Sequence, residues 1–247
     1  MTLFEFFKAN NRIAIGFSGG VDSSYLLYAA VNAGADVTAY YVKTAFQPDF
    51  ELEDAKRIAS QVGAEMKIIE SSILETPHVA DNPRDRCYYC KTAIFSLIKA
   101  EAAKDGFTLL ADGTNASDDS ADRPGMKALK ELSVCSPLRE CGLTKSDIRR
   151  LSKEAGLFTW DKPAYACLAT RIPTGTPITR KKLENVEKAE DILFSMGFTD
   201  FRVRLYGEAA RLQVTGSQLE KALAKREDLL KALSPYFDAV LLDLNCR

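Results

Sequence analysis

Strand-like and helix-like segments alternate through the first half of the chain. Short apolar runs typical of buried strands are followed by segments whose apolar residues recur at helical spacing. The expected strands are residues 12–17, 36–42, 65–70 and 107–111, and the expected helices are 22–31, 50–62, 86–104 and 145–155. This alternation predicts an α/β fold, a doubly wound parallel sheet with helices on both faces.

The pattern changes after a loop marked by Pro163, Pro173 and Pro177. Beyond this loop the sequence predicts a helix, a hairpin around Gly207, a second helix and a last strand. These elements are expected at residues 181–196, 201–206 with 210–214, 217–233 and 239–244. We therefore expect a first domain over residues 1–172 and a small C-terminal α+β domain over residues 173–247.

The composition restricts the classes of partner. The 247 residues are 46% hydrophobic and 27% charged, with a net charge of −1. That supports a sizeable core and lacks the basic excess expected of a protein that grips a nucleic-acid backbone. No apolar run approaches a membrane span, and the first residues do not resemble a signal peptide. We expect a cytoplasmic protein whose six cysteines are free thiols, metal ligands or catalysts rather than structural disulfides.

The string SGGVDSS at residues 18–24 lies between an expected strand and an expected helix. Glycines let the backbone turn tightly and bring its N–H groups up to an anion, and the helix N-terminus adds unpaired donors. An ordinary glycine turn is the alternative, but the strand-turn-helix context favours a phosphate loop. The candidate phosphate-binding residues are Ser18, Gly19, Gly20, Asp22, Ser23 and Ser24.

This string resembles the pyrophosphate loop of a superfamily of ATP-using, adenine nucleotide α-hydrolase-like enzymes, and it lacks the Gly-Lys-Ser/Thr of a Walker loop. The resemblance implies that the loop holds the leaving pyrophosphate while AMP is attached to a substrate, with Mg²⁺ neutralising the triphosphate. It also implies that Val42, Lys43, Gly113 and Thr114 flank the nucleotide. All four are expected at carboxyl ends of parallel strands, where such folds bind ligands.

Five further segments resemble the LarE family of ATP-dependent sulfur transferases, which serve the biosynthesis of the nickel-pincer nucleotide of lactate racemase. The segments are RCYYCK at 86–91, DGTN at 112–115, DRPG at 122–125, SPL at 136–138 and KPAYACLATRIP at 162–173. The resemblance covers nearly the whole chain. It implies an AMP-forming sulfurtransferase that acts on a pyridinium mononucleotide, assembles as a homo-oligomer and works with other proteins of that pathway.

In the implied mechanism, ATP adenylates a carboxylate of the nucleotide, and Cys167 is the catalytic residue. Its thiolate displaces AMP to form a thioester, and cleavage of its Cβ–S bond leaves a thiocarboxylate and a dehydroalanine. Only a small fraction of an ordinary thiol is ionised at neutral pH, so nearby positive charge would help. Lys162 and Arg171 flank Cys167 in the sequence and are expected to supply it.

Cys87 and Cys90 are spaced i, i+3 within an expected helix and therefore face the same way. Structural zinc is disfavoured, since His78 is the only histidine and no second CxxC exists. In some LarE-type and related thiolation enzymes, three cysteines hold a [4Fe-4S] cluster whose free iron carries a sulfide. On that alternative Cys87, Cys90 and Cys167 are metal ligands, and Cys167 survives turnover. The three-thiol set favours the cluster, but both sulfur sources stay open.

Arg202 and Arg204 alternate with apolar residues and share one face of the first hairpin strand. The solvated face of a sheet is the ordinary alternative. The LarE resemblance implies that this Arg-x-Arg pair lies near phosphate, which suits bidentate guanidinium contacts. Arg171 and Arg123 are further expected substrate contacts, the latter in a loop over the site. Glu187 and Glu190 are candidate ligands of a divalent ion.

Three function classes compete on this evidence. The first is the sulfur transferase, and the second is another adenylating pyrophosphate-loop enzyme, either a tRNA thiolase or an amide-forming synthetase. A tRNA thiolase should show a basic surface or an RNA-binding module, and a synthetase needs an ammonia source but no motif cysteine. The third is a non-catalytic adenine nucleotide sensor, which would bind ATP without releasing pyrophosphate.

Overall fold

The computed structural model describes residues 1–118 and 124–247. The chain forms two compact units. The first combines Met1–Thr76 with Asp85–Ala164, and the second combines Pro77–Arg84 with Tyr165–Arg247. Each unit is described by itself. Among the helices of the described residues, none is both long enough and apolar enough to span a bilayer.

The first unit is built on a four-stranded parallel sheet in the order β3-β2-β1-β4. The strands are β1 (Arg12–Gly16), β2 (Asp36–Lys43), β3 (Glu65–Glu70) and β4 (Leu110–Ala111). The predicted parallel sheet is confirmed. Strand β4 is shorter than the expected 107–111, because the Phe107 N–H donates to the carbonyl of Ala102, near the end of the preceding helix, at 2.9 Å rather than to a neighbouring strand.

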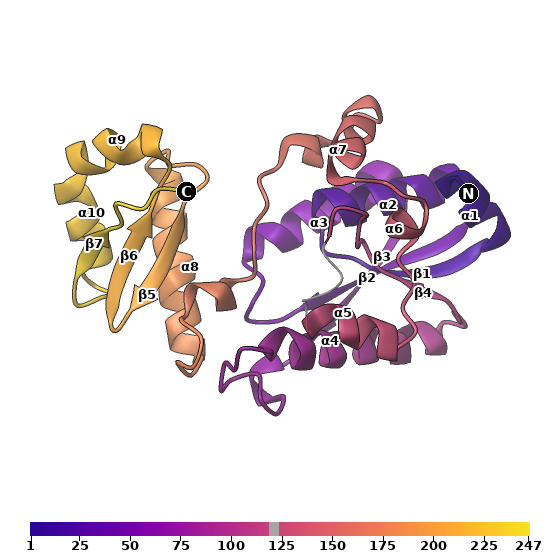
Figure 1. Cartoon of the computed structure of the whole chain (residues 1–247), viewed down its shortest axis with the longest axis horizontal. Coiled ribbons are helices and arrows are strands. Elements are labelled where there is room, and N and C mark those ends of the chain that lie inside the picture. The colour runs from indigo at the N-terminus through magenta and orange to yellow at the C-terminus, as the bar shows by residue number, and fades with distance from the viewer. Residues whose placement is uncertain (119–123) are drawn as a thin grey trace. The chain divides into compact units, whose positions relative to one another are not determined.

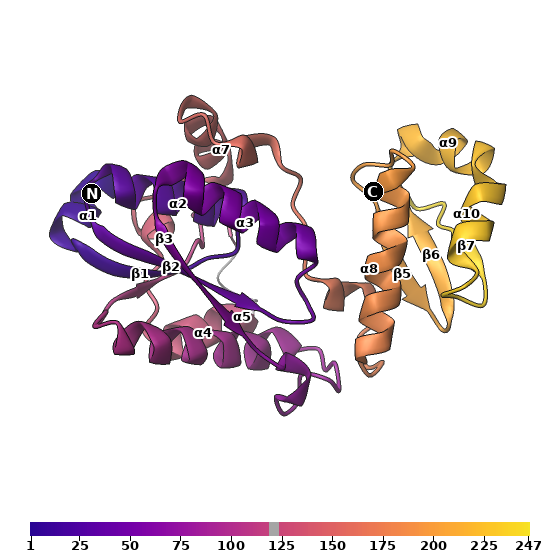
Figure 2. The same cartoon turned by 180° about the vertical axis from the view of Figure 1, so that it is seen from behind.

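Helices cover both faces of this sheet (Figure 1). On one face lie α1 (Leu3–Ala9), α2 (Val21–Asn32), α3 (Asp49–Val62), α6 (Pro137–Glu140) and α7 (Lys145–Glu154). On the other lie α4 (Arg86–Lys104) and α5 (Pro124–Glu131), seen from behind in Figure 2. Residues of β1 alternate between the two cores: Ile13 and Ile15 pack against α2, and Ala14 packs with Phe95 of α4. The doubly wound fold predicted from the sequence is therefore present.

Local signals set several helix ends. Thr144 caps α7 and exchanges hydrogen bonds with Asp147, as the sequence indicates. Gly63 ends α3 in the left-handed conformation, with φ of 69°. A second capping box, Thr2 with Glu5, begins α1, a helix that the sequence analysis did not predict. Two short 3₁₀ turns, Ile73–Glu75 and Phe158–Asp161, complete this unit.

The second unit is a small α+β structure. Its elements are the 3₁₀ turn η3 (Leu168–Arg171), α8 (Arg180–Ser195), β5 (Arg202–Tyr206), β6 (Ala209–Gln213), η4 (Gly216–Gln218), α9 (Leu219–Ala224), α10 (Arg226–Leu233) and β7 (Val240–Leu242). Strands β5 and β6 form the expected antiparallel hairpin, and β7 pairs parallel to β6. The single helix expected over 217–233 is wrong. Lys225, with φ of −96° and ψ of 15°, leaves helical geometry, so α9 ends before it and α10 begins after it.

A buried asparagine explains why residues 77–84 belong to the second unit. The Asn82 amide donates to the carbonyls of Ile172, Pro173 and Thr176 at 3.3, 2.8 and 3.1 Å. The backbone N–H of Gly175 in turn donates to the backbone carbonyl of Asn82 at 2.9 Å. The second unit also includes residues 165–172, which the predicted division assigns to the first domain. As a statement about domains, the division at 172 and 173 stays a prediction.

Candidate functional site

The glycine loop lies where β1 ends and α2 begins. Its serine hydroxyls face each other, with Ser18 Oγ 3.0 Å from Ser23 Oγ. The Ser18 N–H donates to Ser23 Oγ, which donates to the Gly20 carbonyl, each at 3.3 Å. Gly20 occupies the N-cap of α2 and has no side chain, so it leaves the first-turn amides of the helix uncapped. These amides and hydroxyls are the donors that a phosphate group needs.

A second glycine turn lies against this loop. Strand β4 pairs directly with β1, and Gly113 therefore follows β4 beside the loop that follows β1. A Cβ added at Gly113 would lie 2.9 Å from the Ser23 nitrogen. The neighbouring Gly19 has φ of +69°, and a Cβ there would lie 3.0 Å from Ala55 of α3. Glycine is required at both positions, because the two loops and α3 approach one another through their backbones.

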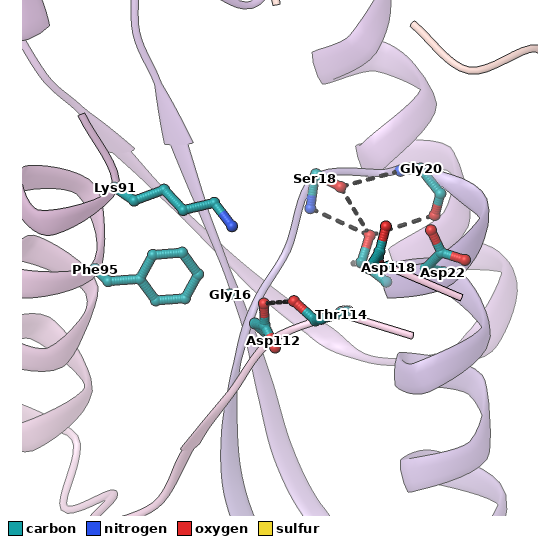
Figure 3. Close-up of a pocket in the computed structure, with 11 residues that line it drawn as sticks. Gly16, Ser18, Gly20, Asp22, Lys91, Phe95, Asp112, Thr114 and Asp118 are labelled. Atoms are coloured by element: carbon teal, nitrogen blue, oxygen red, sulfur yellow. Dashed lines mark hydrogen bonds between the residues drawn. The ribbon is translucent and has the colours of Figure 1, made fainter. Parts of the chain in front are cut away.

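The two turns border a cavity of about 270 Å³, whose lining residues are drawn in Figure 3. Six of its lining residues were expected from the sequence: Ser18, Gly20, Asp22, Ser23, Gly113 and Thr114. Asp118 was expected only in a loop over the site, and four others were not assigned to it: Gly16, Lys91, Phe95 and Asp112. The cavity thus lies at the carboxyl ends of β1 and β4, where this class of fold binds ligands.

Lys91 is the most informative of the residues that the sequence analysis missed. It extends from α4 toward the loop, above the Phe95 ring (Figure 3). Among the described residues, no carboxylate forms an ion pair with its ammonium group. The signal was available, since Lys91 stands four residues before Phe95 and within the RCYYCK segment. A spacing of four residues places both side chains on one helix face, but only the packing of α4 shows that this face meets the loop.

Three carboxylates also line the cavity. Asp112 is buried, and both of its oxygens accept hydroxyl hydrogen bonds, from Thr114 and from Ser136 at 2.7 Å. Asp22 forms an ion pair with Lys145 of α7 at 2.5 Å, while its Oδ1 is buried and has no hydrogen-bond partner among the described residues. Burial raises the pKa of Asp22, although Lys145 opposes the shift. Asp118 accepts from the Asn115 N–H at 3.1 Å.

Four other expected nucleotide contacts do not line this cavity. Gly19 packs against α3, and the hydroxyl of Ser24 is buried without a partner among the described residues. Val42 is buried in the core on the α4 side of the sheet. Lys43 donates to Asp49 and to the Gln47 carbonyl at 2.7 and 2.6 Å. Roles of Val42 and Lys43 in nucleotide binding stay predictions.

The motif cysteines lie in both units. Cys87 and Cys90 occupy the first turns of α4 in the first unit, the former exposed and the latter half-buried. Cys167 is half-buried in the second unit, at the N-cap of η3. None of the three is in a disulfide, as the sequence analysis expected. No group of three potential metal ligands gathers among the described residues.

The two basic residues expected to activate Cys167 have other partners. Lys162 pairs with Asp54 of α3 at 2.6 Å, within the first unit. Arg171 is wholly buried and pairs with Glu190 at 2.8 Å. Burial disfavours the charged form of Arg171, but Glu190 outweighs it, so the pKa of Arg171 lies above its ordinary value. Glu190 is therefore the counterion of a guanidinium rather than an open ligand for a divalent ion.

The hairpin arginines differ in exposure. Arg202 pairs across the strands with Gln213, and Arg204 pairs with Arg211, so the predicted shared face is present. Arg202 is only 5% exposed, which rules out a fully solvated face. Burial lowers the pKa of Arg202 to about 10, with the positive charges of Arg171 and Arg247 adding to the effect. Arg123, the remaining expected substrate contact, lies outside the described residues.

The chain is similar to one protein family and to several known proteins. A family model described as queuosine biosynthesis protein QueC matches residues 12–80, which include the glycine loop. An uncharacterized protein of Synechocystis sp. is 35% identical over 89% of this chain and 82% of its own length. The tRNA-specific 2-thiouridylase MnmA of Thermotoga sp. (strain RQ2) is 26% identical over 75% of this chain and 62% of its own length.

A further relative has a more specific name. The pyridinium-3,5-bisthiocarboxylic acid mononucleotide synthase of Lactiplantibacillus plantarum is 32% identical over 98% of this chain and 89% of its own length. The match spans both units, from the glycine loop to the C-terminal sheet. The chain therefore belongs to the family of this synthase, the LarE family of pyrophosphate-loop proteins.

Proposed function

We propose that this protein is an ATP-dependent sulfur transferase that converts a carboxylate of a pyridinium mononucleotide into a thiocarboxylate. One observation carries the proposal: the glycine loop lines a cavity at the carboxyl ends of parallel strands, in a chain of the LarE family. The name of the relative from L. plantarum supports the substrate class. The step would belong to nickel-pincer nucleotide biosynthesis.

ATP binds to the first unit in this proposal. The α2 amides and the hydroxyls of Ser18 and Ser23 hold the leaving pyrophosphate, and Gly113 lets the second turn come close. Lys91 supplies the positive charge that the cavity needs when phosphate charge develops in the transition state. A carboxylate oxygen is a poor leaving group, and transfer of AMP to it makes the acyl carbon open to attack.

Mg²⁺ fits the carboxylates of this cavity. Asp22 and Asp118 would hold it, since carboxylate oxygens are its preferred protein ligands and Asp22 Oδ1 is buried without a partner among the described residues. The ion would neutralise charge on the triphosphate. Asp112 is less suited, because two hydroxyls already bond to its oxygens.

Cys167 is the proposed sulfur nucleophile. Its thiolate attacks the carbonyl carbon of the acyl adenylate, the bond from that carbon to the AMP oxygen breaks, and a thioester forms. Loss of the Cys167 α-proton then drives cleavage of its Cβ–S bond. The electron pair of that bond leaves with sulfur, which gives the thiocarboxylate and a dehydroalanine on the protein.

A [4Fe-4S] cluster is the alternative sulfur source. Thiolates are the ligands that such a cluster takes, and Cys87 and Cys90 lie one helical turn apart on α4 of the first unit. Cys167 belongs to the second unit, and no group of three such ligands gathers among the described residues, so ligation by all three cysteines stays a prediction. When bound, such a cluster could supply sulfide in place of the Cys167 sulfur, and the cysteine would survive.

Arg202 and Arg204 are the proposed phosphate contacts of the pyridinium nucleotide. The buried guanidinium of Arg202 lies near other positive charges, and an anion would offset that repulsion. Arg171 is not proposed for this role, because its side chain has no exposed surface. Contact by Arg123, assembly into a homo-oligomer, other pathway proteins as partners and a cytoplasmic location stay predictions.

A tRNA substrate is less favoured. The chain has a net charge of −1. RNA-binding surfaces normally carry a basic excess. An amide-forming synthetase is also less favoured, because that function accounts neither for the family match nor for the Cys167 segment.

The test combines the purified protein with ATP, Mg²⁺ and the biscarboxylated pyridinium mononucleotide. We expect release of pyrophosphate and a sulfurated product. Cys167→Ala should retain pyrophosphate release and lose sulfuration, while Cys246→Ala, a change at an exposed cysteine, should retain both. Sulfuration by Cys167→Ala would refute the mechanism.

A second measurement identifies the sulfur source. A mass loss of about 34 Da after turnover would identify a sacrificed cysteine, as expected for loss of H₂S. A brown absorbance in anaerobic protein would identify the cluster.

A further inference from the structure

The Glu190 carboxylate accepts four hydrogen bonds from three residues of the second unit. Arg171 donates from Nε to Oε1 at 2.8 Å and from Nη2 to Oε2 at 3.0 Å, a bidentate pair. The Val203 N–H of β5 donates to Oε1 at 3.0 Å, and the Tyr165 hydroxyl donates to Oε2. One side chain of α8 thus links η3, the hairpin and the segment before Cys167.

Arg171 also bonds to the turn that contains Cys167, here called the Cys167 turn (residues 166–171). Its Nη1 donates to the Ala166 carbonyl at 2.8 Å and to Thr170 Oγ1 at 2.9 Å, and it lies 3.5 Å from the Cys167 carbonyl. The Cys167 carbonyl also accepts from the Thr170 N–H at 2.9 Å. The Thr170 hydroxyl donates to the same carbonyl at 2.8 Å. The Arg171 guanidinium therefore binds the Ala166 carbonyl directly and reaches the Cys167 carbonyl mainly through Thr170, whose hydroxyl oxygen accepts from Nη1.

Tyr165 is fixed by the same network. The Arg171 guanidinium lies 4.5 Å from the centre of its ring, and that of Arg202 lies 5.1 Å away. These contacts immobilise the residue two positions before Cys167. Arg204 holds the other end of the turn, with Nη1 donating to the Thr170 carbonyl at 2.7 Å.

The burial of this ion pair argues against a role in stability alone. The Arg171 side chain is 0% exposed and that of Glu190 is 2% exposed. Removing two charges from water costs about as much as their attraction returns, and apolar residues of similar volume often replace such pairs without loss of stability. This pair also bonds to the backbone next to Cys167, so fixing the position of that cysteine explains its presence better than a contribution to stability does.

We propose that Arg171 and Glu190 are positioning residues that hold the Cys167 turn in the geometry required for sulfur transfer. The inference rests on the proposed function, in which the Cys167 sulfur is the nucleophile or a cluster ligand. Either role needs a thiol held in one place, because a misplacement of about 1 Å can lower a rate about a hundredfold.

The test uses the double variant Arg171→Met/Glu190→Leu in the full chain. It removes both charges and keeps the side-chain volumes, but it leaves the Val203 N–H and the Ala166 carbonyl without these partners, so it should be moderately destabilised yet folded. Glu190→Gln alone strands a buried guanidinium and should be destabilised more. The matched control is Arg226→Gln/Glu227→Gln, which removes an exposed pair of the same unit at 3.3 Å. Hydrogen exchange of the peptide over 163–172 and the kinetics of sulfuration are measured for each.

In the double variant we expect exchange over 163–172 to become about tenfold faster while the peptides of α10 keep their rates. The rate constant of sulfuration at saturating nucleotide should fall about tenfold or more, with the half-saturating concentration changed less than about threefold. Release of pyrophosphate, which needs no thiol, should continue. The control pair should change none of these values.

A folded double variant with parental exchange and parental sulfuration would overturn the proposal. So would a fall in rate that follows only from a higher half-saturating concentration, because that would assign the pair to substrate binding. If Cys167→Ala still sulfurates the nucleotide, the proposed function fails, but the exchange of the 163–172 peptide still decides whether the pair orders the turn.

Discussion

Gly113 approaches the first turn of α2 so closely that a Cβ at this position would lie 2.9 Å from the Ser23 amide nitrogen and 3.2 Å from its Cα. Both neighbours are backbone atoms, which cannot rotate away as a flexible side chain would. The contact joins the loop after β4 to the loop after β1, and it sets the shape of the proposed phosphate site.

Gly113→Ala is therefore expected to weaken ATP binding more than it weakens the fold. Displacement of the Ser23 amide would lose one hydrogen bond to a charged phosphate, about 1.5 to 3 kcal/mol or roughly ten- to a hundredfold in Kd. Titration calorimetry with ATP measures the effect. Gly216→Ala is the control, since its nearest outside atom is 3.9 Å from the added Cβ. Equal affinity in both variants would contradict this account of the site.

Lys91→Met is expected to slow the release of pyrophosphate about a hundredfold, because it removes the positive charge that faces the developing phosphate charge. The assay is a single-turnover measurement with labelled ATP and the pyridinium nucleotide. Lys104→Met, on the same helix, removes an exposed lysine that pairs with Glu101 at 2.6 Å, and it should leave the rate unchanged. A Lys91→Met enzyme as fast as the Lys104→Met control would exclude Lys91 from the reaction.

Asp22 should make the stability of the protein depend on pH in an identifiable way. Burial raises its native-state pKa above the ordinary value of 3.8, so the folded state favours the protonated form. The stabilisation that this preference gives to the folded state is fully present below pH 3.8, and it is lost as the pH rises through the native-state pKa of Asp22. Relative to Asp22→Asn, the parent should lose stability over that interval. Denaturant titrations at a series of pH values test this, and a difference that stays flat or grows with pH would contradict it.

The cysteines outside the motifs should differ widely in reactivity. Burial raises the pKa of the Cys135 thiol to about 12 and also raises that of Cys141. Near pH 8 only about one Cys135 side chain in 10,000 is then a thiolate, so alkylation of the native protein should be slow there. Exposed Cys246 should react readily. Peptide mass spectrometry after timed iodoacetamide treatment compares the sites. Denatured protein should label all of them alike, and rapid native labelling of Cys135 would show that the site opens.

Much of the fold is predictable from local patterns. The parallel strands, the major helices of the first unit and the hairpin around Gly207 follow from apolar periodicity and turn residues. The errors have local causes too. Short α1 begins with a capping box, Thr2 with Glu5, that the sequence analysis did not identify. The helix expected over 217–233 is interrupted at Lys225, where the backbone leaves helical geometry.

The sequence by itself determined the position and conformation type of the glycine loop, because its glycines and serines bond to backbone and side chains only a few residues away. It also determined which cysteines carry a family pattern. Only the tertiary structure decided that Lys91 faces this loop, that Gly113 meets Ser23, and that Arg171 is paired with Glu190 rather than open to a ligand. These relationships join residues from different elements, and they depend on how helices and strands pack, which no local spacing specifies.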